Sequence, residues 1–343
     1  MKFFKSVILQ KILNTDWIFG YNNPVEKVKY TNNWWQYKPM DETQRYTLFD
    51  PWDCTSRGKM NVLETLFNYK IKNNLFSEKA ISFLKGKNCL EVSYFDSNGS
   101  INFLDKYIAA LSGTVAGVGN TFAKPADTIR DFGLVPENAF KWTDIDLNNL
   151  KSREYYDLKT IEYLKSLGQE FNEIFQLNYE VVQRKNFRYA IDYSPIECGV
   201  QAWTYDGENY VRNGNINHDC VIMNIPDKYE IFDSYSPFIK QLSPTYEFMD
   251  HGYIWFVREK QKNMILKDKN KYTAIIGEKP GVPAHKEYGF AKAGKLIVGD
   301  RDEILNLFVD ETGGDIKGKV ITVTGKDFYS VPHYNTKLQK IKD

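Results

Sequence analysis

FDPWDCTSRGKMNVLETLFNYKI, residues 49–71, places Cys54 directly before a run of apolar residues at nearly helical spacing. The spaced positions are Met60, Leu63, Leu66, Phe67 and Ile71. This pattern predicts a helix over 55–73 that begins just after the cysteine. The positive end of a helix dipole favours a thiolate, and the thiolate is the nucleophilic form of cysteine. The segment therefore predicts a helix with a candidate nucleophile at its start.

NHDCVIMNIPDKYEIFDSYSP, residues 217–237, is typical of a β-hairpin. Two β-branched and aromatic runs, 219–225 and 229–233, flank a turn at 226–228. Residues whose numbers sum to about 451–453 face each other across such a turn, so His218 and Asp233 are expected within about 5–8 Å. There the carboxylate can accept the imidazole N–H, fix the tautomer and stabilise the charged ring. A thiol, a histidine and a carboxylate in this order predict nucleophilic catalysis.

About half-way along the chain, the sequence pattern changes from helical to strand-like. Helical spacing predicts further helices over 77–86, 101–112, 124–132 with a stop at Gly133, and 153–177, whereas strand-like runs cover 198–206 and 253–257. A helical half followed by an antiparallel half predicts the α+β class. We expect an N-terminal arm at 1–45, a main domain at 46–257, and at 258–343 a charged linker with a small α/β or mostly β appendage.

Composition limits the classes of partner. Hydrophobic residues make up 42% of the 343, enough for a substantial core. The 45 basic and 44 acidic residues nearly cancel, which argues against a nucleic-acid binder. No apolar run reaches the roughly 18 residues of a membrane span, and the N-terminus lacks the features of a signal peptide. The four cysteines lack metal-ligand spacing, so we expect free thiols and a cytoplasmic or virion-associated location rather than secretion.

The candidate residues also allow purely structural interpretations. Cys54 also fits a buried cysteine at a helix start, and Cys89, Cys198 and Cys220 fit small buried apolar residues. Asp53 next to the thiol opposes a second negative charge if it points toward the sulfur. The other histidines are interpreted as incidental because no comparable partner is near them in sequence; they are His251, His285 and His333.

With these residues in place, the chain resembles the papain-like cysteine peptidase family over residues 40–257. Glu64 follows Cys54 by ten residues, as in that family, and EIFDSYSP lies where the family carries Asn-Ser-Trp, so Asp233 replaces the asparagine. The resemblance implies a two-lobed fold, a protein or peptide substrate, and hydrolysis by Cys54, His218 and Asp233 without metal or organic cofactor. In the general character of its sequence, the chain is similar to divergent family members from phages and uncultured bacteria.

The chain departs from the family pattern around the nucleophile. Leu48 stands where the oxyanion-hole glutamine is usual, which leaves Gln44 as the candidate donor beside the backbone N–H of Cys54. Only 53 residues precede Cys54, so the family's inhibitory pro-segment is not expected. Two alternatives stay open: a cell-wall amidase or endopeptidase, and a catalytically inactive structural or binding protein such as a virion component. The appendage would dock substrate or join a larger assembly.

Overall fold

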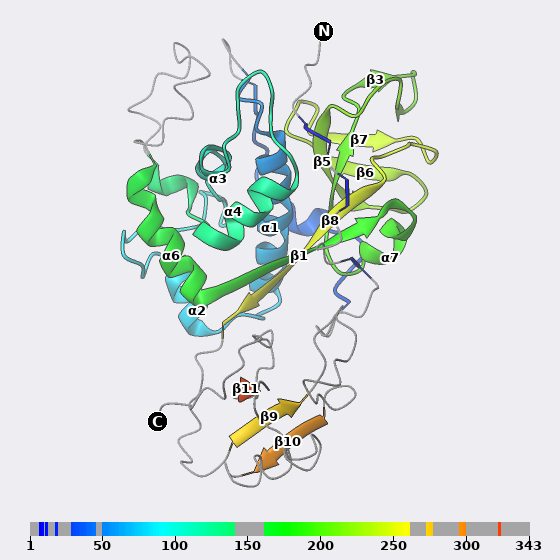
Figure 1. Ribbon diagram of the computed structural model, residues 1–343. Coiled ribbons are helices and arrows are strands. Elements are labelled where there is room, and N and C mark those ends of the chain that lie inside the picture. Colours follow the sequence, from blue (N-terminus) through cyan, green and yellow to red (C-terminus); the bar gives the residue numbers. More distant parts are fainter. Residues whose placement is uncertain are drawn as a thin grey trace. The chain divides into compact units, whose positions relative to one another are not determined.

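Helix α1 (Cys54–Lys72) is the central element of the computed structural model (Figure 1). The structure describes residues 7–9, 11–12, 18–19, 29–45, 50–140 and 161–260, and the backbone of three further strands. The chain divides into two compact units, Met1–Phe19 with Lys27–Lys260 and Gly20–Glu26 with Gln261–Asp343. Most of the α1 side chains are buried, because the helix lies between the other helices of the first unit and its sheet.

Four further helices of the first unit form one lobe against α1. They are α2 (Glu78–Leu84), α3 (Asp105–Leu111), α4 (Ala123–Phe132) and α6 (Lys165–Ile174). The short α7 (Phe187–Ala190) lies beside the sheet (Figure 1). The unit also contains the 3-10 turns η1 (Trp35–Tyr37), η2 (Glu137–Ala139), η5 (Glu162–Leu164) and η6 (Arg184–Asn186). The Ser77 hydroxyl caps α2 by accepting the Ala80 N–H. As the sequence predicts, Gly133 ends α4, with φ 72°. A Cβ on Gly133 would lie 1.9 Å from the Gly168 carbonyl oxygen, so glycine permits α4 and α6 to approach this closely.

The second half of the first unit forms an eight-stranded sheet. Its strands are β1 (Phe175–Gln183), β2 (Ile196–Val200), β3 (Thr204–Tyr205), β4 (Tyr210–Val211), β5 (His218–Asn224), β6 (Tyr229–Phe232), β7 (Ile239–Leu242) and β8 (His251–Glu259). Their order is β1-β8-β2-β5-β6-β7-β4-β3. Neighbouring strands run antiparallel except β4 and β7, which meet at one parallel pair. The fold is α+β, as the sequence predicts.

The β5–β6 hairpin confirms the prediction for 217–237. Val221 faces Phe232 and Ile222 faces Ile231, after which a register shift accommodates the turn. The bounds of two predicted helices were wrong. Residues 101–104 precede α3 as extended chain, and Phe175 opens β1 instead of continuing the helix predicted to 177. The part of that predicted helix at 153–160 lies outside the described residues. Arg258 and Glu259, assigned to the linker, belong to β8.

An aromatic cluster explains how the helical lobe is joined to the sheet. Phe67 of α1 lies 5.0 Å from Phe175 of β1 between ring centroids, and Phe171 of α6 lies 4.9 Å from the same ring. These rings belong to one hydrophobic core that also takes in Trp34 from the N-terminal arm. Burial of such rings is a major source of stability, so both lobes and part of the arm share one core.

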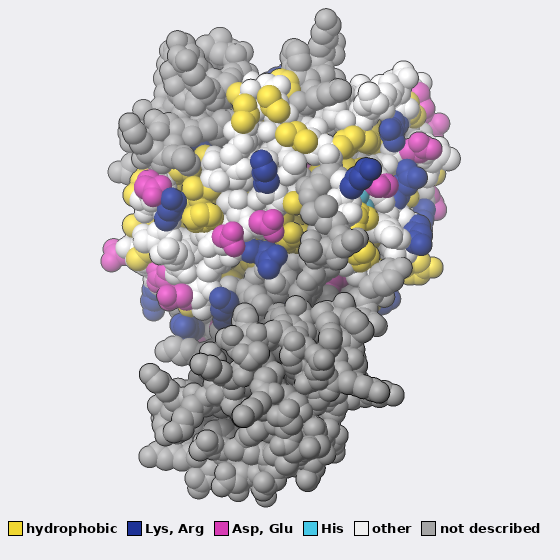
Figure 2. Space-filling view, in the orientation of Figure 1, with side chains coloured by type: hydrophobic (Ala, Val, Ile, Leu, Met, Phe, Trp, Pro, Cys, Tyr) yellow, Lys and Arg dark blue, Asp and Glu magenta, His cyan; other side chains and the backbone are white. Residues whose placement is uncertain are grey.

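The second unit contains three described strands. They are β9 (Tyr272–Ile276), β10 (Lys295–Gly299) and β11 (Thr322–Val323), in an antiparallel sheet of order β10-β9-β11. On the face drawn in Figure 2, basic and acidic side chains of the described residues lie interspersed over the first unit. No described helix is long and apolar enough to cross a membrane.

Candidate active site

Cys54 is the first residue of α1 and its side chain is fully buried. It lies in a small apolar cluster with Val7, Phe122, Val181, Ile216, Met249 and Tyr253. Val7 reaches this cluster because the N-terminal segment pairs with Asn120, whose carbonyl accepts the Ile8 N–H at 2.8 Å. At this point the N-terminal arm bonds to the helical lobe and packs into the cluster that surrounds the candidate nucleophile.

The Asp53 carboxylate is held by a cation one helical turn further along α1. Arg57 Nε donates to Asp53 Oδ1 at 2.9 Å, and another nitrogen of the same guanidinium lies 2.8 Å from Asp105 Oδ2. Burial raises the pKa of Asp53 to about 6, although the Arg57 charge acts in the opposite direction. Since this carboxylate oxygen is bonded to Arg57, the repulsion expected between Asp53 and a thiolate is reduced.

A second polar cluster fixes α1 against β5. The Lys59 ammonium donates to Glu197 of β2, and both side chains are fully buried. Asp219 of β5 lies beside them, and burial, followed by the charge of Glu197, raises its pKa well above the ordinary value. A Cβ on Gly58 would lie 2.5 Å from Asp219 Oδ2, so a larger residue here would have to displace this buried carboxylate. The cluster sets the distance between the start of α1 and the start of β5.

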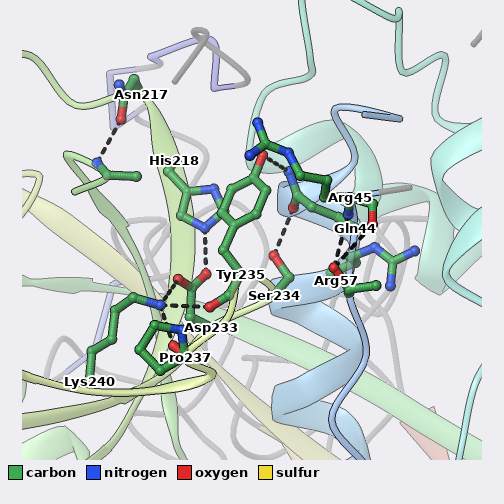
Figure 3. A network of polar contacts seen from close by, with 12 residues as sticks. Gln44, Arg45, Arg57, Asn217, His218, Asp233, Ser234, Tyr235, Pro237 and Lys240 are labelled. Atoms are coloured by element: carbon green, nitrogen blue, oxygen red, sulfur yellow. Dashed lines mark hydrogen bonds and ion pairs between the residues drawn. The ribbon is translucent and has the colours of Figure 1, made fainter. Parts of the chain in front are cut away.

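His218 begins β5, and its side chain is bonded to Asp233 as the hairpin register predicts. The distance from His218 Nε2 to Asp233 Oδ1 is 2.6 Å, and both side chains are buried. Figure 3 shows the imidazole standing over the carboxylate, with the ring of Tyr235 beside it at 4.8 Å between centroids. Among the described residues, His218 Nδ1 has no hydrogen-bond partner. The nitrogen that does not contact Asp233 is thus available for another group.

The Asp233 carboxylate has a second cationic partner, which the sequence reasoning missed. Lys240 Nζ of β7 donates to Asp233 Oδ2 at 2.6 Å. Burial opposes ionisation of Asp233, but His218 and Lys240 together hold its pKa below the ordinary value. Asp233 is therefore a carboxylate at neutral pH.

Gln44, the candidate oxyanion donor, is fully buried and its side-chain amide is already bonded. Its Nε2 donates to the Tyr235 hydroxyl at 2.5 Å and to Asp50 Oδ1 at 3.3 Å, while its Oε1 accepts from the Ser234 hydroxyl at 2.7 Å (Figure 3). Both amide protons have partners in this arrangement. Donation to an oxyanion would require Gln44 to release one of them.

Tyr235 and Asp50 link this network to the start of α1. The Tyr235 hydroxyl donates to Asp50 Oδ2 at 2.5 Å, and Asp50 Oδ1 accepts the Trp52 N–H at 2.8 Å. Burial raises the pKa of Tyr235, and negative charge on Asp50 and on Cys54 acts in the same direction. Cys54 therefore lies within electrostatic range of the hydroxyl whose ring packs on His218. Asp50 carries no sequence signal beyond its place four residues before the cysteine.

The expectation that His251 has no partner was wrong. Its Nδ1 lies 2.5 Å from Oδ1 of the adjacent Asp250, and its ring is buried at the start of β8. His285 and His333 lie outside the described residues. Within the part of the chain that the structure describes, no group of three or more His, Cys, Asp or Glu side chains is arranged to hold a metal ion.

No protein-family model matches the chain, and no curated protein does. Similar solved structures include a digestive procathepsin L 3 from the larval midgut of Tenebrio molitor, with TM-score 0.40 and 10% identity, covering 70% of this chain and 74% of that one. A recombinant stem bromelain precursor has TM-score 0.39 and 11% identity, covering 73% and 80%. Both are papain-like cysteine protease precursors. At these values function must be inferred from the chain's own residues, and the expected likeness to phage proteins gains no support.

Proposed function

We propose that this protein is a cysteine peptidase of the papain type, with Cys54 as nucleophile, His218 as base and acid, and Asp233 as the group that orients His218. The observation that carries the proposal is the 2.6 Å bond from His218 Nε2 to Asp233, with Nδ1 lacking a hydrogen-bond partner among the described residues. An imidazole held by one nitrogen and open at the other is the arrangement that a thiol–imidazole pair needs.

The proposed chemistry follows from these positions. His218 Nδ1 takes the Cys54 proton, and the thiolate is favoured by the start of α1. The sulfur attacks a peptide carbonyl, and the imidazolium then gives its proton to the leaving amine, which leaves an acyl-enzyme. A water molecule deprotonated by His218 releases the acid and restores the thiol. Asp233 holds the ring through both steps.

The oxyanion would be stabilised by the backbone N–H of Cys54 and by Gln44. The Gln44 bonds to Tyr235 and Asp50 support a role as a second donor only if substrate displaces one of them. Because Ser234 holds the oxygen of the same amide, its nitrogen would stay on the side of Tyr235. Asp50 and Tyr235 would then set where that donor lies.

One observation favours a second candidate function, a binding protein without catalysis. The Cys54 side chain is fully buried against apolar neighbours, Val7 among them, so in this arrangement a substrate carbonyl does not reach the sulfur. For the peptidase proposal the N-terminal segment must move away from the thiol. For the alternative it stays in place.

A peptide-library digestion separates the two candidates. The full-length protein is incubated with a mixed proteome-derived peptide library, and new peptide termini are identified by mass spectrometry. We expect cleavage by the wild type and by Cys89→Ala, since Cys89 is the exposed thiol, and a loss of about 10³-fold or more for Cys54→Ala. Matching circular dichroism spectra would show that the Ala variant is folded. Val7→Asp is included because it should weaken the cover over the thiol. Equal cleavage by the wild type and Cys54→Ala would rule out the peptidase, and so would a lack of cleavage by all of these proteins.

A further inference from the structure

The Asp233 carboxylate lies between two cationic groups (Figure 3). His218 takes one oxygen and Lys240 takes the other, each at 2.6 Å. The Asp233 and Lys240 side chains are 0% and 1% exposed. A buried lysine is stabilised as a cation only by such pairing, because an unpaired charge in the interior loses its hydration. The acceptor that His218 faces is thus an ion pair and not an isolated carboxylate.

The sheet register explains how Lys240 reaches this position. Lys240 faces Ile231 across the β6–β7 pair, and Asp233 follows two residues after Ile231 on the same face. The Asp233 N–H also donates to the Phe238 carbonyl at 2.8 Å, which keeps the two chains together beyond the end of β6. Ile239, next to Lys240, is 53% exposed. β7 therefore places a lysine inward and an isoleucine outward.

The Lys240 ammonium is also held by groups other than Asp233. It donates to the Tyr235 carbonyl at 2.7 Å and to the Pro237 carbonyl, and it lies 5.0 Å from the centre of the Trp203 ring. These contacts hold the segment that carries Asp233 and Tyr235. Among the described residues, His218 and Lys240 are the cations within salt-bridge distance of Asp233. The other titratable groups near this pair are Cys54 on α1, Tyr210 on β4, Cys220 on β5, and Tyr235.

We propose that Lys240 is a positioning residue for the reaction: by pairing with Asp233 it makes the acceptor of His218 nearly neutral overall and fixes it in place, so that the imidazole is oriented without being locked as the cation. The inference rests on the proposed peptidase function. A lone buried carboxylate would favour the imidazolium strongly and would oppose the transfer of its proton to a leaving amine. With Lys240 in place the orienting bond is kept and that bias is reduced.

The test is a pH titration of the His218 ring by NMR on the full-length protein labelled with ¹⁵N-histidine, since this signal does not depend on access to Cys54. His218→Gln assigns the resonance. We expect Lys240→Met to move the titration midpoint to higher pH by about one unit or more, and Asp233→Asn to move it to lower pH. The double variant D233N/K240M removes both charges and should return to within about half a unit of the wild type. Lys240→Arg keeps the charge and should stay near the wild type.

A purely structural lysine would give a different pattern. If the lysine were purely structural, Lys240→Met would be less stable, but the His218 midpoints of Lys240→Met and Asp233→Asn would not move in opposite directions. An unchanged midpoint in Lys240→Met overturns the proposal. If Lys240→Met does not fold, D233N/K240M is compared with Asp233→Asn. Because a cation has been removed, the double variant should titrate at higher pH, and equal midpoints would equally overturn the proposal.

Cleavage of the peptide library by the same proteins separates this inference from the proposed function. If the wild type cleaves peptides and the pH dependence of kcat/KM is the same in Lys240→Met, the lysine proposal fails and the peptidase stands. If opposite midpoint shifts are found but no folded variant cleaves, Val7→Asp included, the peptidase fails and the charge pairing remains. The expected result is cleavage with the alkaline limb of the profile moved to higher pH in Lys240→Met.

Discussion

Asp53 and Asp233 are both fully buried carboxyl groups, yet their surroundings move their pKa values in opposite directions. The cation paired with Asp53 is Arg57, and the same guanidinium also forms ion pairs with Asp105 at 2.8 Å and Glu42 at 3.5 Å. Burial therefore dominates there, whereas Asp233 has His218 and Lys240 on its two oxygens. The number of cations per carboxylate decides the direction in which the pKa of each is shifted.

This difference predicts a pH dependence of stability that Asp53→Asn should reduce. The folded pKa of Asp53 is about 6 against an ordinary value of 3.8, so the folded state binds the proton more tightly than the unfolded chain. The free energy of unfolding should fall as the pH rises from about 4 to about 6, by about 3 kcal/mol at most from this group, and then level off. Urea unfolding at pH 4.5 and pH 7 should show a smaller fall in Asp53→Asn than in the wild type.

Asp233 contributes to the pH dependence of stability with the opposite sign. Its folded pKa lies below the ordinary value, so its contribution is present above about pH 4 and is lost as the pH falls through the folded value. Asp233→Asn is not a neutral control between pH 4.5 and pH 7, because it also removes the hydrogen-bond partner of His218. A slope equal in wild type and Asp53→Asn would show that Asp53 is ionised in the folded protein throughout this range.

The pairing of His218 with Asp233 could be predicted from sequence because a tight turn fixes which residues of a hairpin face each other. Lys240 could not. Burial on β7 alternates so that Ile239 is exposed and Lys240 is buried, the reverse of what hydrophobicity alone suggests. Lys240 can be buried because it pairs with the Asp233 carboxylate, which follows β6. Only the register of β6 against β7 in the folded protein shows this pairing. Asp50 escaped prediction for a similar reason, since its partners Gln44 and Tyr235 come from separate segments.

At the scale of elements, the bounds of α1 were predictable and those of β1 were not. Apolar side chains at helical spacing and a start at Cys54 define α1. The spacing that predicts a helix continues from Phe171 to Phe175, four residues on, although the helix ends at Ile174. Both phenylalanines enter the same aromatic core, one from α6 and one from β1, so the spacing alone does not show where the backbone changes.

The N-terminal segment gives a prediction at this scale. Val7 is 5% exposed in the cluster around Cys54, whereas the next residue, Ile8, is 41% exposed. Burial of a valine contributes about 1.5–3 kcal/mol, so Val7→Asp should weaken the cover and raise the alkylation rate of Cys54 about tenfold or more. The rate is measured with iodoacetamide in the Cys89→Ala background, which removes the exposed thiol.

Ile8→Asp is the matched control, because it introduces the same charge one residue away on a side chain that already meets solvent. Its alkylation rate should stay within about twofold of the parent protein. Equal acceleration by both substitutions would point to a general loosening of the segment, and no acceleration by Val7→Asp would mean that Val7 does not limit access to the sulfur.

At the scale of the whole molecule, the predicted boundary at residue 257 is close to the division between the two units. The first unit extends to Lys260, whose N–H donates to the Ile174 carbonyl at 2.6 Å. Glu259 accepts the Ser77 N–H at 2.8 Å at the start of α2, and it faces Phe175 across the β1–β8 pair. Sequence placed these residues in a linker because they are charged. Their contacts instead belong to the helical lobe and β1.

Two truncated chains test which boundary is physical. A chain of residues 1–260 keeps every described contact of Arg258, Glu259 and Lys260 within the first unit, so it should unfold cooperatively. The NMR signal of its His218 ring should match that of the full-length protein, which would show that the hydrogen bond to Asp233 is kept. A chain of residues 1–257 loses the last rungs of the β1–β8 ladder, the Glu259 bond to Ser77 and the Lys260 bond to Ile174. At about 1 kcal/mol for each net hydrogen bond, its free energy of unfolding in urea should be lower by about 2–4 kcal/mol. Equal stability of the two chains would place the boundary at 257, and failure of both to fold would show that the first unit needs the second for its stability.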